Sequence, residues 1–131
     1  MNDRIVRAFI VSLGVGLVST GVFAHHGAAV YDNDTTVEVA GKVTRFEFVN
    51  PHVLIYAAVT DADGKVVEWS GELTSPNRLA RAQRSTVKWH KDMFQPGDDI
   101  TLIGNPARNG APSLRLREVI DGDGTQLIGG S

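Results

Sequence analysis

The feature that most constrains the fold of this chain is a series of short segments in which apolar and polar residues alternate. Such alternation has a period of two, which is typical of a strand with one buried face. The pattern predicts five strands, over residues 36–49, 52–60, 65–73, 100–105 and 113–120. Turn sequences separate them, and Asp-Ala-Asp-Gly at 61–64 and Asp-Gly-Asp-Gly at 121–124 are interpreted as hairpin turns rather than calcium loops. We therefore expect an all-β protein.

The first of these strands changes face along its length. Val37, Val39 and Val43 share one face, whereas Phe46 and Phe48 fall on the other parity. A strand keeps one face buried through such a shift only if it contains a bulge. The pattern thus predicts a long, bent first strand with a bulge near Thr44 or Arg45.

A single helix is predicted between the third and fourth strands. Ser75 is suited to cap a helix and Pro76 to occupy its first position, so residues 75–83 should be helical with Leu79 buried. Three strands, a helix and two strands is the element order of the OB-fold. We therefore predict an all-β domain with one short helix, arranged as a five-stranded, OB-like, partly open antiparallel barrel. An open antiparallel sandwich is the alternative, because one sequence does not specify strand order.

The first 24 residues have the three parts of a secretory signal peptide. Arg4 and Arg7 precede an uncharged stretch, and Val22 and Ala24 are small residues at the positions before a cleavage site. The alternative is an uncleaved anchor, but the uncharged run at residues 8–24 is shorter than the ~20 residues of a membrane-spanning helix. We expect cleavage after Ala24, a periplasmic or secreted location, and no membrane span in the mature protein.

Cleavage would leave residues 25–131, which we divide into an N-terminal arm at 25–35 and a barrel domain at 36–131. This length suits one domain with one core. The chain has no cysteine, which excludes disulfides, thiolate metal sites and a cysteine nucleophile. Loss of residues 1–24 would change 13 basic and 15 acidic residues to 11 and 14, a charge of −3. That balance gives no general attraction to nucleic acid, which is not an expected partner.

Histidines provide the main suggestion of chemistry. Cleavage after Ala24 would place a free amine and an imidazole on His25, with His26 beside it. The amine and ring nitrogen of His25, with a third nitrogen from His52, would form a T-shaped histidine brace, a tetragonal nitrogen site of the kind that Cu(II) prefers. We therefore predict a metal site at His25, His26 and His52, with copper as the cofactor. Solvated histidines on the arm, a turn-capping role for His52 and a surface position for His90 are the alternatives.

A metal-free binding module is the second hypothesis. OB-type barrels bind ligands on the face of their second and third strands. On that face this chain offers Leu54, Tyr56, Ser70 and Glu72, with Arg115 and Arg117 expected nearby. Tyr56 and Glu72 are the candidate residues for a peptide, glycan or envelope-protein partner. Glu68 and Glu72 are interpreted as a solvated face or as partners of His52, and no motif identifies an enzyme.

Four segments resemble a known family: Ala24-His25-His26, residues 41–52 ending in Asn-Pro-His, residues 68–77 with Glu-Trp and Ser-Pro-Asn, and Pro96-Gly97-Asp98. Together they are similar to the small exported bacterial proteins of domain-of-unknown-function family number 6152. The resemblance implies export, a single domain and a role for His25, His26 and His52, but no reaction. Gly27 departs from the family pattern, in which a hydroxyl residue usually follows the paired histidines.

Overall fold

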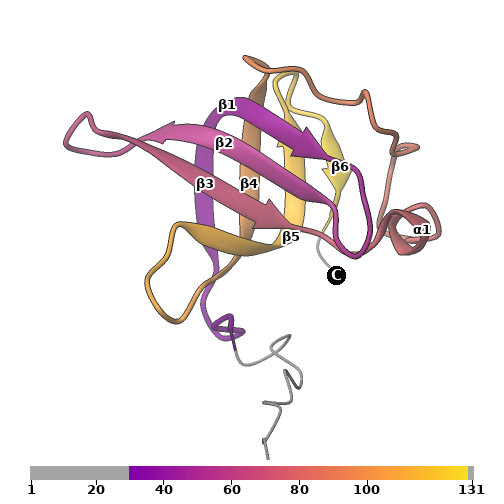
Figure 1. Cartoon of the computed structure of the whole chain (residues 1–131), viewed down its shortest axis with the longest axis horizontal. Helices are drawn as coiled ribbons and strands as arrows, with labels where there is room; N and C mark the ends of the chain where they lie inside the picture. The colour runs from indigo at the N-terminus through magenta and orange to yellow at the C-terminus, as the bar shows by residue number, and fades with distance from the viewer. Residues whose placement is uncertain (1–29, 130–131) are drawn as a thin grey trace, which may run out of the picture.

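The computed structural model describes residues 30–129 of the chain. These residues form a six-stranded sheet that curls into a barrel, with one short helix outside it (Figure 1). The elements in chain order are β1 (Val37–Glu47), β2 (Leu54–Thr60), β3 (Val66–Glu72), α1 (Pro76–Leu79), β4 (Asp99–Pro106), β5 (Ser113–Asp121) and β6 (Gln126–Ile128). No helix within residues 30–129 has the length and apolar character needed to cross a bilayer.

Strand β1 belongs to both halves of the barrel. Its first half pairs with β4 and its second half with β2, and both ladders are antiparallel. The β1–β2 register shifts between Val43 and Arg45, which confirms the predicted bulge. Gly41 lies just before it, where an added Cβ would clash with the carbonyl oxygen of Ala58. The bend therefore depends on a glycine as well as on the bulge.

The barrel closes through a pairing between β3 and β5, which run parallel. Strand order around the barrel is therefore β1, β2, β3, β5, β4 and back to β1. The predicted fold class, an all-β barrel with one short helix, is confirmed. The structure differs from the expectation in three details: the barrel is closed, its pairing is mixed rather than purely antiparallel, and β6 adds a sixth strand beside β5.

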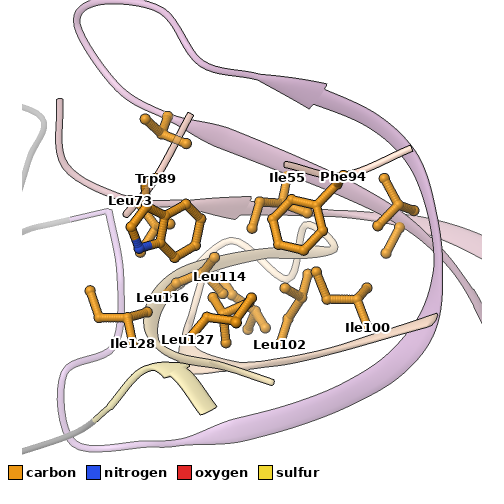
Figure 2. Close-up of a cluster of buried hydrophobic side chains, with 14 of the residues drawn as sticks. Ile55, Leu73, Trp89, Phe94, Ile100, Leu102, Leu114, Leu116, Leu127 and Ile128 are labelled. Atoms are coloured by element: carbon orange, nitrogen blue, oxygen red, sulfur yellow. The ribbon is translucent and has the colours of Figure 1, made fainter. Parts of the chain in front are cut away.

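The core lies inside the barrel and takes buried side chains from β1, β2, β4, β5 and β6 (Figure 2). Val53, Ile55 and Ala57, which alternate along the second strand, are 0 to 1% exposed. Trp89 and Phe94 are also buried, although they come from the segment between α1 and β4, which has no regular secondary structure. Phe94 meets Phe46 edge to face, with ring centroids 5.1 Å apart. Aromatic packing thus holds this irregular segment over the barrel.

Helix α1 begins as predicted but ends earlier. The Ser75 hydroxyl accepts a hydrogen bond from the Arg78 amide, Pro76 takes the first helical position, and Leu79 is fully buried. The predicted end near residue 83 is wrong, because tighter turns follow and Thr86 then donates its amide to Leu127 of β6. That contact draws the chain back to the sheet after one helical turn.

Both Asp-Gly sequences close hairpins, as predicted. The amide of residue 61 bonds to the carbonyl of Lys65, and that of residue 121 to Thr125. In each turn the aspartate side chain accepts two backbone amides, and the glycine at the fourth position has a φ near +80°. These carboxylates are thus engaged in turn formation.

Candidate functional site

His52 lies at the start of the β2 ladder, next to the end of β3. It follows Pro51 and precedes Val53. The Val53 amide donates to the Thr74 carbonyl, and the Val53 carbonyl accepts from the Leu73 amide. These two bonds to the segment after β3 fix the backbone next to His52. The His52 side chain is 52% exposed, so its ring remains accessible to solvent.

Glu72 orients this ring. Nδ1 of His52 lies 2.8 Å from Oε1 of Glu72, a charge-assisted hydrogen-bond distance. With its Nδ1 proton donated to the carboxylate, a neutral imidazole keeps its lone pair on Nε2. The sequence analysis named Glu68 and Glu72 as possible partners of His52. The structure brings Glu72 to the ring, whereas Glu68 accepts a hydrogen bond from the Thr44 hydroxyl.

The second oxygen of Glu72 binds the N-terminal arm. The Tyr31 hydroxyl donates to Oε2 at 2.9 Å and lies 3.4 Å from the Ser113 hydroxyl. Burial raises the pKa of the Tyr31 phenol above 10.0; the bond with Ser113 lowers it, and Glu72 adds to the rise. Tyr31 therefore remains a donor at neutral pH. Glu72 joins the arm, through Tyr31, to His52.

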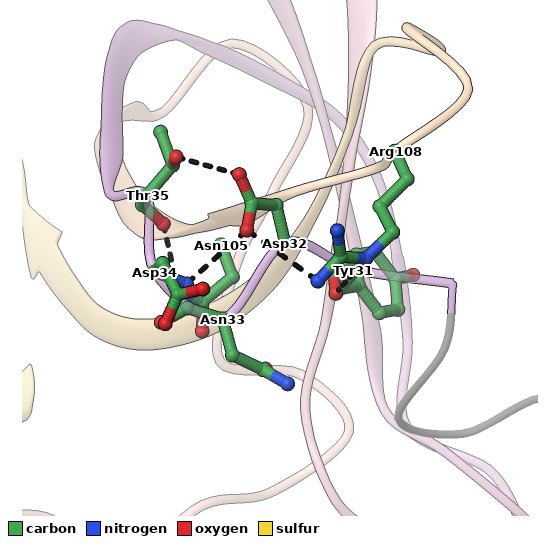
Figure 3. Close-up of polar contacts among 7 residues, drawn as sticks. All are labelled: Tyr31, Asp32, Asn33, Asp34, Thr35, Asn105 and Arg108. Carbon is green, nitrogen blue, oxygen red and sulfur yellow. Dashed lines mark hydrogen bonds and ion pairs between the residues drawn. The ribbon is translucent and has the colours of Figure 1, made fainter.

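The arm itself is held by a polar cluster (Figure 3). Tyr31 forms a bridge with Ala107, and the Arg108 guanidinium donates to the Tyr31 carbonyl and lies 3.5 Å from Asp32. The Thr35 hydroxyl and the Asp34 amide both donate to the Asp32 carboxylate. These bonds, with a smaller contribution from Arg108, lower the pKa of Asp32 below 3.8. The backbone at Tyr31 is thus fixed by contacts with the 107–112 turn, and its side chain by Glu72 and Ser113.

A pocket of about 390 Å³ adjoins this linkage. It lies between the end of β3, the α1 region and β5, and His52, Glu72 and Tyr31 line one side. Apolar residues in the lining include Leu73, Leu116 and Ile128. The remaining lining includes four arginines, Arg78, Arg84, Arg115 and Arg117. The pocket is therefore basic, with one carboxylate that already has two partners.

The structure brings some of the predicted site residues together and leaves others apart. His52 and Glu72 are in contact, and Arg115 and Arg117 lie near them as expected. Tyr56 lies on the outer face of β2, paired with Ser70 of β3, but does not line the pocket. The Arg45 guanidinium lies 3.9 Å above the Tyr56 ring and covers one of its faces.

The remaining histidines are not part of this linkage. His25 and His26 lie outside the described residues. His90 is exposed between Trp89 and Lys91 and does not line the pocket. Within residues 30–129, no three His, Cys, Asp or Glu side chains are grouped closely enough to hold a metal ion.

Sequence reasoning missed three residues that shape this region: Tyr31, Arg78 and Arg84. Tyr31 precedes the first alternating segment and is 41 residues from Glu72, so no local pattern linked them. Arg78 had a findable signal, because Ser75 and Pro76 place it on the first turn of a helix.

Comparison with known proteins gives one match. The model of a family of unknown function, DUF6152, matches residues 14–114. No curated protein and no solved structure matches the chain.

Proposed function

The chain belongs to DUF6152, a family of unknown function, and from that premise we propose that it is a small exported protein that binds copper through His25, His26 and His52. Export to the periplasm or the medium is supported by the signal-like sequence of residues 1–24. The copper proposal rests mainly on one observation: Glu72 holds Nδ1 of His52 while the ring stays half exposed.

This arrangement suits a metal ligand. Histidines that bind metals usually donate their second ring N–H to a carboxylate, which fixes the ring and increases the basicity of the ligand nitrogen. With Nδ1 of His52 committed to Glu72, Nε2 is the atom that would bind the metal. Imidazole is a favourable donor for copper, and Cu(II) heads the affinity order of the divalent ions.

The anchoring of Tyr31 supports participation of the arm. Tyr31 and His52 are bonded to opposite oxygens of Glu72, so the described part of the arm begins beside the proposed ligand. His26 is five residues before Tyr31, and five residues span up to about 17 Å when extended. The segment is thus long enough for His25 and His26 to reach Nε2 of His52. The His25 amine must lose its proton to bind copper, and its ordinary pKa makes that step accessible near neutral pH.

The metal-free alternative, a module that binds a peptide, glycan or envelope protein through Tyr56 and Glu72, has less support. Arg45 covers one face of the Tyr56 ring, and Glu72 is bonded to Tyr31 and His52. Neither side chain is free to serve as the central contact of a partner surface.

The proposal is tested by Cu(II) titration against a competing chelator, followed by electron paramagnetic resonance. The protein should be exported and processed by its own leader, with His25 as the first residue confirmed by intact mass. We expect one stoichiometric, nitrogen-ligated, tetragonal species. Glu72→Gln, which keeps the side-chain shape, should weaken binding by about 10- to 100-fold.

His52→Ala and an extra residue before His25 should each weaken binding more than Glu72→Gln does. His90→Ala is the matched control, since His90 is exposed and away from the pocket, and it should leave affinity unchanged. Weak heterogeneous spectra, or an unchanged affinity in His52→Ala, would refute the copper proposal.

A further inference from the structure

The pocket beside Glu72 concentrates positive charge from three separate parts of the chain. Arg78 comes from α1, Arg84 from the segment after it, and Arg115 and Arg117 from β5. All four side chains belong to exposed residues, so their guanidinium groups are accessible. The pairing of Glu72 with Arg115, which closes the barrel, is what brings β5 to this position.

These charges are not neutralised within the described chain. Among residues 30–129, none of the four guanidinium groups lies within 4.0 Å of a carboxylate. Arg117 donates to the neutral side-chain oxygen of Asn105 at 2.7 Å. Glu72 is the acidic residue of the lining, and its oxygens are bonded to His52 and Tyr31. The fold therefore gathers four positive charges around one concave surface without pairing them.

The shape of the pocket limits what could neutralise them. A volume of about 390 Å³ is at the small end of the usual range for ligand sites. Its lining combines apolar residues, Leu73, Leu116 and Ile128, with the four arginines. Planar guanidinium groups match the paired oxygens of carboxylates and phosphates. A compact ligand with several such oxygens fits both properties.

We propose that this pocket binds a small oxyanion carrying at least two negative charges, with carboxylate or phosphate groups held by Arg115, Arg117, Arg78 and Arg84. The proposal goes beyond copper binding and requires no metal. The barrel contributes two of the arginines from a rigid strand, and α1 and the following turn contribute the other two.

Metal is first removed from the protein with a chelator, and the chelator is then dialysed away because a polycarboxylate would itself compete for the pocket. The metal-free protein is titrated calorimetrically with citrate and, separately, with pyrophosphate. We expect saturable one-to-one binding of at least one probe, weakened by added salt. Preference for citrate would assign a carboxylate ligand, and preference for pyrophosphate a phosphate ligand. Absence of saturable binding by both probes would overturn the proposal.

Arg115→Gln is the most informative variant, because Arg115 is exposed and makes no side-chain hydrogen bond within residues 30–129 whose loss would affect folding. It should weaken binding at least about tenfold, as expected for loss of a charge-assisted contact. Arg81→Gln is the matched control, since Arg81 is exposed near α1 but does not line the pocket. Equal losses in the two variants would indicate non-specific attraction and overturn the proposal.

Measuring the copper affinity of the variants distinguishes the anion-binding proposal from the copper-binding proposal. Arg115→Gln should leave copper affinity unchanged or raise it, because the substitution removes a positive charge near His52. His52→Ala should abolish tight copper binding. Arg81→Gln should retain both copper binding and anion binding. If the protein binds no copper but still binds the anion, the copper proposal fails and the anion-binding proposal stands.

Discussion

Two pockets of nearly equal size carry opposite charge in this protein. The arginine pocket beside Glu72 measures about 390 Å³, and an acidic pocket lined by Asp98, Asp99, Asp121 and Asp123 measures about 410 Å³. In the acidic pocket most of the carboxylates already have hydrogen-bond or ion-pair partners. Asp98 accepts the Gln95 amide, Asp99 pairs with Lys42, and Asp121 accepts the amides of residues 123 and 125.

The difference teaches that charge density alone does not identify a binding site. Three of the four aspartates have structural partners: Asp98 and Asp121 accept backbone amides in turns, and Asp99 pairs with Lys42. The arginines have no carboxylate partners within residues 30–129. A formal charge of −2 for the whole chain hides this separation. Substitutions on the acidic side should therefore affect folding alone, whereas those on the basic side should also affect ligand binding.

The largest expected effect is that of Gly104→Ala in β4. A Cβ at this position would clash with the backbone of Arg115, so the strand that carries two pocket arginines would have to shift. We expect a loss of about 3 kcal/mol or more in unfolding free energy, at the upper end of overpacking effects, measured by urea denaturation. In Gly122→Ala, on the acidic pocket, the added Cβ meets the Cβ of Asp99 at 3.2 Å and its carbonyl oxygen at 3.4 Å, so the substitution should cost much less. Equal costs would contradict this comparison.

Asn105→Leu should have the next largest effect. Asn105 is 2% exposed, donates to the Thr35 carbonyl at 2.7 Å and accepts from Arg117. Loss of both bonds leaves polar groups unsatisfied, which should cost about 2 kcal/mol. Denaturation measures that cost, and calorimetry should show weaker anion binding because Arg117 loses its support. Full stability in this variant would show that the Asn105 bonds do not hold the arm and β5 together.

A smaller, pH-dependent effect is expected for Asp32→Asn. The pKa of Asp32 is lowered in the folded protein, so its contribution to stability is present above the unfolded pKa, near 3.9, and is lost as the pH falls through the folded value. The wild type should melt above the variant at pH 7, and the two should converge at the acidic end of a series from pH 7 to pH 2. A constant difference in melting temperature would contradict the assignment.

The smallest effect is expected for Asp99→Asn in the acidic pocket. Its ion pair with Lys42 is 2.7 Å long, but both side chains are more than 60% exposed. Such pairs contribute little, so the change in unfolding free energy should be below about 0.5 kcal/mol. Citrate and pyrophosphate binding should also remain as in the wild type. A clear change in anion affinity would show that the two pockets are not independent.

The sequence predicted much of the barrel because the strands have one buried face each. Alternation located β1 to β5, and the change of parity after Val43 located the bulge. The closing pair of β3 with β5 could not be predicted, because parallel pairing of distant strands leaves no local pattern. Trp89 and Phe94 were missed as core residues since their segment has no periodicity.

The candidate site was predictable only where neighbours in one ladder were involved. Glu72 pairs with Leu54 in the β2–β3 ladder, and His52 lies two residues before Leu54, so their contact follows from a hairpin that the turn at 61–64 specifies. Tyr31 and the four arginines come from four places along the chain and meet only after closure. The net charge of the chain is negative, so it gave no indication of a site for an anion.

The central claim, that ligand chemistry is located at the Glu72 end of the barrel and not in the acidic pocket, is tested most directly by paramagnetic broadening. Cu(II) would be added below one equivalent to isotope-labelled, processed protein, and backbone amide signals recorded by nuclear magnetic resonance. We predict loss of signals at Tyr31, His52 and Glu72, with those of Asp99 and Asp121 retained. Selective loss of the aspartate signals, with His52 unaffected, would contradict the claim.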